Sequence, residues 1–226
     1  QFQNGEYLEQ ADGTSWMAMF ALNMMRIAME LALYNPVYED MAIKFFEHYL
    51  YIAEAMESLG EDKKGLWDEE DGFFYDVLQL NDGTGISLKL RSIVGLIPMF
   101  AVEVVEHDML EKMPKFKARM DWILKNKEEL ANLVSHWEVE GKGRKHLMSI
   151  LRKNRLTKIL NRMLDEKEFL SEFGIRSMSK TYEEKPFQLE INGINHVVHY
   201  TPAESDSRMF GGNSNWRGPF WLPINC

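Results

Sequence analysis

The strongest constraint on the fold is a long helical run near the N-terminus that is apolar on almost every side. Between residues 14 and 34, apolar side chains recur at the i, i+3, i+4, i+7 spacing of a helix, at Met17, Phe20, Ala21, Met24, Ile27, Ala28 and Leu31. The opposite side of this run is apolar as well, at Met19, Leu22, Met25, Met29 and Leu33. A helix with this pattern is buried on both sides. The run therefore predicts a mainly α protein, with Thr14 or Ser15 capping its first helix.

Further helices are expected along the chain. Pro36 begins a second helix that runs to about residue 59, and Gly60 just past its end fits the usual preference for proline first and glycine last. Later helices are expected at about 92–105, 112–125 and 145–164. Pro98 should kink or end the first of these three, and Asn154 is a candidate break in the last.

Two β-hairpins are expected in the connections. Residues 73–78 and 86–88 flank the turn sequence at 81–85, and residues 188–191 and 196–200 flank the Asn192-Gly193 turn. Mostly helical chains with long decorated loops often carry their chemistry in those loops.

Charge and cysteine content exclude several classes of protein. With 26 Lys and Arg against 35 Asp and Glu, the net charge of −9 argues against general nucleic-acid binding. The basic stretch at 142–162 is interpreted as a solvated helix face. The single cysteine, Cys226, fits a reducing compartment, and we expect a cytoplasmic protein. No apolar run approaches the roughly 20 residues of a membrane span, so no membrane contact is expected.

The first motif that could carry chemistry is the segment from Glu9 to Trp16. Asp12 lies just before the expected helix start, and a capping role is the commonest use of such an aspartate. The functional alternative is a carboxylic acid beside the Trp16 indole, whose apolar ring favours the protonated form that a general acid needs. Trp16 is also a candidate stacking surface for a sugar ring.

The second motif, Leu66–Asp76, holds five acids and four aromatic residues. Its spacing does not match a calcium-binding EF-hand loop, and the pair His196 and His199 points to opposite faces of a strand, so we expect no metal site. A solvated turn explains part of the motif. Functionally, Trp67 and Phe73 could stack on a sugar ring while Asp71 accepts hydrogen bonds from its hydroxyl groups.

The third motif is the loop from Phe210 to Trp221, which contains three glycines, two asparagines, one arginine and two tryptophans. Such a loop presents amides and aromatic faces together, as a neutral polyhydroxylated ligand requires. The candidate binding residues here are Asn213, Asn215, Trp216 and Arg217. Arg217 could equally be a structural tie to a carboxylate.

Together these motifs resemble glycoside hydrolase family 63, in particular its large bacterial glucosidases. The residues that carry the likeness are Glu9–Met17, Leu66-Trp67 with Asp71–Asp76, Ser92–Pro98 and Gly211–Trp221. The family includes processing α-glucosidases and mannosylglycerate hydrolases.

The resemblance implies part of an (α/α)6 toroid with β-hairpin insertions, in which residues 1–226 form one catalytic domain that is incomplete at its C-terminus and, we expect, at its N-terminus. It implies cofactor-free hydrolysis of α-glucosidic or α-mannosidic bonds in oligosaccharides or small glycosides, with inversion at the anomeric carbon. Asp12 matches the general acid. The general base lies beyond the Trp-Arg-Gly-Pro loop and has no matching position before Cys226, so the piece alone is expected to be inactive.

Two other classes of function stay open. One is a different helical-toroid enzyme, such as a phosphorylase or a trehalase-like hydrolase. The other is a carbohydrate-binding or structural module that has no hydrolytic activity. The sugar, its linkage and the oligomeric state cannot be read from the sequence.

Overall fold

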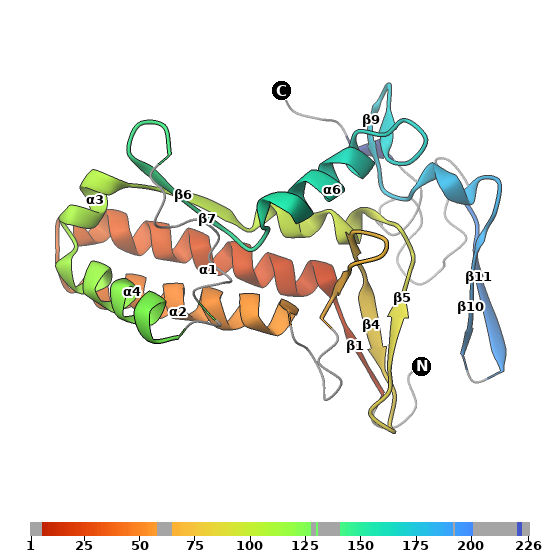
Figure 1. Ribbon diagram of the computed structural model, residues 1–226, viewed down its shortest axis with the longest axis horizontal. Coiled ribbons are helices and arrows are strands. Elements are labelled where there is room, and N and C mark those ends of the chain that lie inside the picture. Colours follow the sequence, from red (N-terminus) through yellow and green to blue (C-terminus); the bar gives the residue numbers. More distant parts are fainter. Residues whose placement is uncertain are drawn as a thin grey trace. The chain divides into compact units, whose positions relative to one another are not determined.

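The computed structural model describes residues 6–57, 65–127, 130, 141–191, 193–200 and 221–222 (Figure 1). The described chain combines α-helices with several small antiparallel sheets. The expected mainly α architecture, part of an (α/α)6 toroid, is therefore wrong, because two segments expected to be helical form paired strands. The chain divides into two compact units, which are described separately: unit 1 comprises residues 1–11, 66–96 and 154–226, and unit 2 comprises residues 12–65 and 97–153.

Two long helices dominate unit 2. Helix α1 spans Ala11–Ala32, close to the helix that the apolar spacing predicts, and α2 spans Tyr38–Glu57, close to the helix expected between Pro36 and Gly60. They run antiparallel to each other in Figure 1. Within the described chain α1 is buried along one face only, because Met17, Phe20 and Ile27 on the other face are each more than half exposed.

Side chains satisfy the first amides of α1, which begins three residues before the expected Thr14. The Asp76 carboxylate accepts the Ala11 N–H at 2.8 Å, and the Asp12 carboxylate accepts the Gly13 N–H at 2.8 Å. These amides have no partner within a helix, so carboxylates near them stabilise the helix start. Asp12 lies in the first turn of α1 rather than at the cap position before it.

The rest of unit 2 mixes short helices with a strand pair. Its elements are η2 (Ile97–Phe100), β6 (Val102–Glu106), α3 (His107–Glu111), α4 (Pro114–Asn126) and β7 (Lys145–Ser149). Strands β6 and β7 are antiparallel, with Val102 opposite Ser149 and Glu106 opposite Lys145. The helices expected at 92–105 and across the start of 145–164 are wrong at these positions. Val-Glu-Val-Val-Glu in β6 carries the β-branched residues that favour a strand.

Helix α4 agrees with the expected 112–125 helix and is fixed by a buried carboxylate. Glu39 on α2 is only 4% exposed, and it accepts the N–H groups of Lys115 at 2.8 Å and Phe116 at 3.1 Å. The Phe116 ring in turn packs against Phe46, with centroids 5.6 Å apart. Carboxylate–amide hydrogen bonds and an aromatic contact therefore join α4 to α2, and the ion pair of Arg119 with Glu47 at 2.6 Å adds to them.

Unit 1 contains several small sheets and helix α6 (Lys153–Met163). One sheet has the order β1-β4-β5, from Tyr7–Glu9, Asp76–Gln79 and Gly85–Leu88. Trp67–Asp68 (β2) pairs with Phe73–Phe74 (β3), and a third sheet has the order β12-β9-β8, from Trp221–Leu222, Gly174–Arg176 and Leu170–Ser171. The short helices are η1 (Ile93–Gly95) and η3 (Lys180–Tyr182).

Both expected hairpins are confirmed. Strands β4 and β5 pair from Asp76 opposite Leu88 to Gln79 opposite Gly85. Strands β10 (Phe187–Ile191) and β11 (Ile194–Val198) pair across the turn that contains Gly193, whose φ of +75° is the left-handed conformation that glycine tolerates.

Candidate functional site

The candidate site is centred on Asp71, in the turn between β2 and β3. The Asp68 carboxylate accepts the Asp71 N–H at 2.8 Å, and the Asp68 carbonyl accepts the Gly72 N–H at 2.8 Å. Gly72 has φ +61°, and a Cβ there would lie 2.7 Å from Cδ of Lys158. The positive φ is strained for residues with a side chain, and a side chain there would also displace that of Lys158. The turn holds Asp71 in one position.

Asp71 is surrounded by hydrogen-bond donors. Nη2 of Arg91 lies 2.8 Å from its carboxylate, the Tyr75 hydroxyl donates to it at 3.1 Å, and Nζ of Lys89 lies 3.6 Å away. Burial alone would raise the pKa of Asp71, but the hydrogen bond and charge of Arg91, with help from Tyr75 and Lys89, hold that pKa below its ordinary value. Asp71 is therefore ionised at neutral pH and acts as a hydrogen-bond acceptor.

Arg91 is held by its backbone as well as by its side chain. Its N–H donates to the Tyr182 hydroxyl at 2.8 Å, and its carbonyl accepts the Ser179 N–H at 2.9 Å. Burial works to lower the pKa of the Arg91 guanidinium, but Tyr75, Asp71 and Glu168 outweigh burial and raise it. Arg91 therefore stays charged and fixed beside Asp71.

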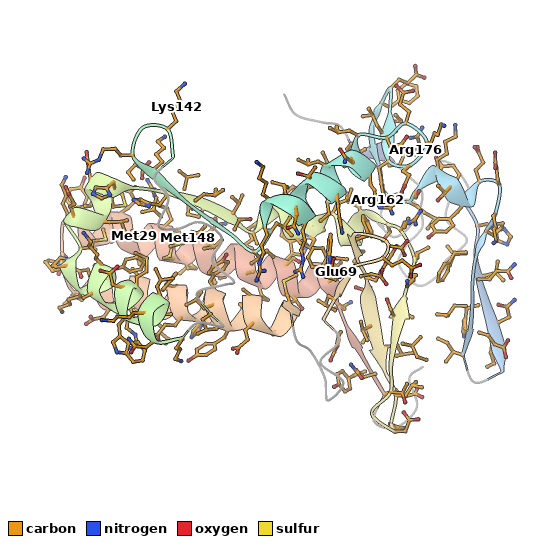
Figure 2. The ribbon with its side chains drawn as sticks, in the orientation of Figure 1. Met29, Glu69, Lys142, Met148, Arg162 and Arg176 are labelled. Atoms are coloured by element: carbon orange, nitrogen blue, oxygen red, sulfur yellow. The ribbon has the colours of Figure 1, made fainter. Side chains whose placement is uncertain are left out.

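Two arginines and two acids form a continuous network around this point. Nη1 of Arg91 is 3.7 Å from the Glu168 carboxylate, which also forms an ion pair with Arg162. Arg162, which projects from α6 in Figure 2, donates its Nε–H to the Asp71 carbonyl at 3.1 Å. Alternating charges at these distances support one another. The network ties α6 to the β2–β3 turn.

A hollow of about 530 Å³ opens beside the network. Its volume lies within the range of small-molecule sites, roughly 300–1,000 Å³. Three aromatic side chains share the lining with charged and amide groups: Asp71, Tyr75, Lys89, Arg91, Tyr182, Lys185, Pro186, Phe187 and Gln188. Aromatic faces together with charged hydrogen-bonding groups are what a sugar ring with hydroxyl groups would contact.

Trp67 lies near this turn, but cations already cover its ring. The Arg155 guanidinium is 5.0 Å and the Lys158 ammonium 5.7 Å from the ring centroid, and the side chain is 9% exposed. Glu69 pairs with both cations, at 3.4 Å and 3.6 Å. A sugar could stack on Trp67 only where these cations leave its surface open.

Phe73 lies in the core. Its side chain is 0% exposed and packs between Tyr75 and Phe169, with centroid distances of 5.4 Å and 5.8 Å. It supports the turn that carries Asp71 rather than offering a surface to a ligand.

The other predicted residues belong to unit 2 or lie outside the described residues. Asp12, 5% exposed, and Trp16 both belong to α1 in unit 2, where Trp16 stacks on Phe100 at a centroid distance of 5.7 Å. The remaining predicted binding residues, Asn213, Asn215, Trp216 and Arg217, lie outside the described residues.

Sequence reasoning missed Arg91, Glu168, Tyr182 and Phe187. No local pattern links them to Asp71, because each lies on a separate segment. Arg91 comes directly before the Ser92–Pro98 motif, and this position next to a motif was the signal that could have drawn attention to it.

Comparisons with known proteins give a relative without a described function. No family model matches the chain. An uncharacterized protein of Saccharomyces cerevisiae, YMR196W, is 47% identical over 233 residues, which cover 98% of this chain. The chain spans 21% of the length of that relative. Activity, substrates and partners of the whole protein are therefore proposals.

None of the described helices is both long enough and apolar enough to cross a membrane. Nor do the described residues contain a group of three His, Cys, Asp or Glu side chains that could hold a metal ion.

Proposed function

We propose that the chain contributes to an inverting glycoside hydrolase that cleaves α-glucosidic or α-mannosidic bonds of oligosaccharides or small glycosides. The observation that carries the proposal is the hollow beside Asp71, where an ionised carboxylate, a fixed guanidinium and three aromatic rings lie together. The motif resemblance supports the same class of substrate. The single cysteine supports a reducing compartment such as the cytoplasm.

In this proposal the hollow holds a sugar ring through two kinds of contact. The Asp71 carboxylate accepts hydrogen bonds from sugar hydroxyls, and Arg91 donates to a hydroxyl oxygen; hydrogen bonds to charged groups are roughly twice as strong as neutral ones. Tyr182 and Phe187, whose centroids are 6.0 Å apart, present aromatic surface to the apolar face of the ring. Because Asp71 is already ionised, it binds and does not protonate the leaving group.

The general acid in the proposal is Asp12. As the resemblance implies, it would protonate the glycosidic oxygen while a second carboxylate activates water on the opposite face of the sugar. Inverting enzymes hold the two carboxyl groups about 6.5–9.5 Å apart to admit that water. General acid or base assistance accounts for about 10²–10⁴ in rate. The chemistry needs no metal ion, and this piece alone would turn over little substrate.

The decisive experiment uses a complete protein that contains this chain and follows α-glucosyl and α-mannosyl disaccharides by proton NMR. We expect the β-anomer of the released sugar to appear first. Asp12→Asn should abolish turnover with little change in thermal stability, and Asp71→Asn should raise KM. Asp82→Asn is the matched control, because Asp82 is fully exposed in the β4–β5 turn.

Three outcomes would contradict the proposal. The α-anomer appearing first would exclude inversion. Activity retained in Asp12→Asn, together with a large loss of stability, would leave Asp12 as a helix-stabilising residue only. Cleavage that depends on phosphate would indicate a phosphorylase.

A carbohydrate-binding module is the second candidate, and one observation favours it. Asp71, Arg91 and Glu168 already satisfy one another in a charged network, which suits binding more than chemistry. Saturable sugar binding by the complete protein without any hydrolysis would support this reading.

A further inference from the structure

One face of α1 carries a row of large apolar side chains that face solvent in the described structure. Three of them, Met17, Phe20 and Ile27, are each more than half exposed, and Tyr34, two residues past the end of the helix, is 89% exposed. The row follows the chain in steps of three and four residues. It consists of Met17, Phe20, Met24, Ile27, Leu31 and Tyr34, which we call the α1 seam.

The spacing of the α1 seam is that of a helix that packs against another helix. Steps of three and four residues are those of the a and d positions of a heptad, and they let a second helix cross at about 20° with its side chains set between those of the first. The seam residues are all uncharged. Beside the seam, Arg26 pairs with Glu30 at 2.8 Å and with Glu106 at 2.7 Å, so these charges are already neutralised. The seam therefore fits an apolar helix.

The α1 seam is also complementary to itself when the second helix runs in the opposite direction. A two-fold axis beside the helix, level with the midpoint between residues 25 and 26, brings each seam residue of one copy to another seam residue of the second copy. None of the six is left without an apolar counterpart. The counterparts across the two copies are Met24 with Ile27, Phe20 with Leu31, and Met17 with Tyr34.

The polar residues that flank the seam match in the same arrangement. Asn23 and Glu30 lie along one side of the seam, and both are exposed. An antiparallel pair brings Asn23 of one copy beside Glu30 of the other, where the amide can donate a hydrogen bond to the carboxylate. A parallel pair would instead align the two helix dipoles, which is unfavourable. Self-complementarity of both the seam and its flank favours a second copy of this chain as the occupant.

The available surface is close to what a specific dimer buries. The Phe100 ring stacks on Trp16, and the Val104 carbonyl accepts a hydrogen bond from Arg26 at 3.1 Å, so this segment lies alongside α1. Phe100, Val102 and Val104 are between 37% and 47% exposed. A large side chain that is half exposed leaves roughly 100 Å² uncovered. The seam and these three residues together therefore approach the roughly 800 Å² per partner of a specific interface.

We propose that the protein forms a two-fold symmetric dimer in which the α1 seams of two copies pack against each other in antiparallel orientation. The seam residues form the apolar centre of the interface, and Asn23 and Glu30 form hydrogen bonds at its edge. Phe100, Val102 and Val104 lie at its margin. The dimer is independent of the proposed glycosidase activity.

The test uses a complete protein that contains this chain, followed by sedimentation velocity over a range of concentrations. We expect a dimer. Met24→Lys and Ile27→Glu should each weaken dimerisation about tenfold or more, because two-fold symmetry places the new charge at the centre of the interface twice. Leu164→Glu is the matched control. Leu164 is 54% exposed and Ile27 is 52% exposed, but Leu164 belongs to unit 1, so its substitution should leave the dimer unchanged.

A mixture of the two charged variants tests the antiparallel arrangement itself. The new lysine at position 24 of one variant faces the new glutamate at position 27 of the other, so the mixture should form a heterodimer although each variant alone is largely monomeric. Thermal melting of each variant by circular dichroism separates a loss of dimer from a loss of fold.

Three results would overturn the proposal. A monomeric complete protein would show that another part of the same polypeptide covers the α1 seam. A dimer that survives Ile27→Glu would place the interface on a different surface. Folded variants that fail to associate when mixed would exclude the antiparallel pairing.

Discussion

Gly95 is the position where a single added methyl group should most disturb the candidate site. A Cβ at Gly95 would lie 2.2 Å from Cε1 of Phe73 and 2.4 Å from the carbonyl oxygen of Phe74. Ordinary contacts begin near 3.4 Å, so the atoms overlap by about an ångström. Neither neighbour can move without a loss of folding stability, since Phe73 is fully buried and the Phe74 carbonyl belongs to the backbone of β3.

The magnitude follows from these contacts. Overpacking a well-filled core costs about 1–3 kcal/mol, and we place Gly95→Ala at the upper end because a backbone atom is involved. The alanine also restricts the unfolded chain, which returns about 0.4–1 kcal/mol of stability. The net loss in free energy of unfolding should be about 2 kcal/mol.

Gly85→Ala is the matched control. Its Cβ would meet Cγ1 of Val77 at 3.2 Å and the amide of Gln79 at 3.3 Å, which are the ends of side chains and can shift by a few tenths of an ångström. We expect a change within about 0.5 kcal/mol. Urea unfolding of both variants, followed by tryptophan fluorescence and analysed at a common m-value, gives the comparison. Equal stability of the two variants would refute the packing reasoning for Gly95.

Three further predictions follow from the described contacts. The folded-state pKa values of Asp68 and Asp71 lie below their ordinary values. Their contribution to stability is therefore present above the unfolded pKa of about 3.9 and is lost as the pH falls through the folded values. The urea midpoint should drop between pH 5 and pH 2, and it should drop less in Asp71→Asn. Arg91→Met should lower the free energy of unfolding by about 1–3 kcal/mol, a value reduced from that of a fully buried pair because the side chain is one-quarter exposed. Lys180→Met is the control and should change the free energy of unfolding little. Equal losses for the two variants in calorimetry would contradict this. The exposed apolar face of α1 predicts self-association, which sedimentation should detect and Phe20→Glu should reduce; a monodisperse monomer would contradict it.

The long helices and both hairpins could be predicted from the sequence because their signals are local. Apolar spacing located α1, and Pro36 with Gly60 located α2, each to within a few residues; the turn sequences at 81–85 and at Gly193 located the hairpins. Each of these signals lies within the element that it predicts or beside it.

The strands β6 and β7 show where local reading failed. Residues 102–106 have only one buried residue among five, and residues 145–149 fall in a basic stretch that resembles a solvated helix face. Each becomes a strand by pairing with the other, about forty positions away, and no short window contains that partner. Pairing between distant strands therefore makes the helical interpretation of these residues wrong, and the expected toroid with it.

For the candidate site, the sequence by itself identified Asp71, because acids, aromatics and a turn glycine lie within one short motif. Only the tertiary structure decided its role. Arg91, 20 positions away, holds the carboxylate ionised, Arg162, 91 positions away, binds its backbone carbonyl, and Phe73 turns inward to the core. A motif fixes which groups are present, but the charges that surround a carboxylate set its protonation, and those come from segments that meet only when the chain folds.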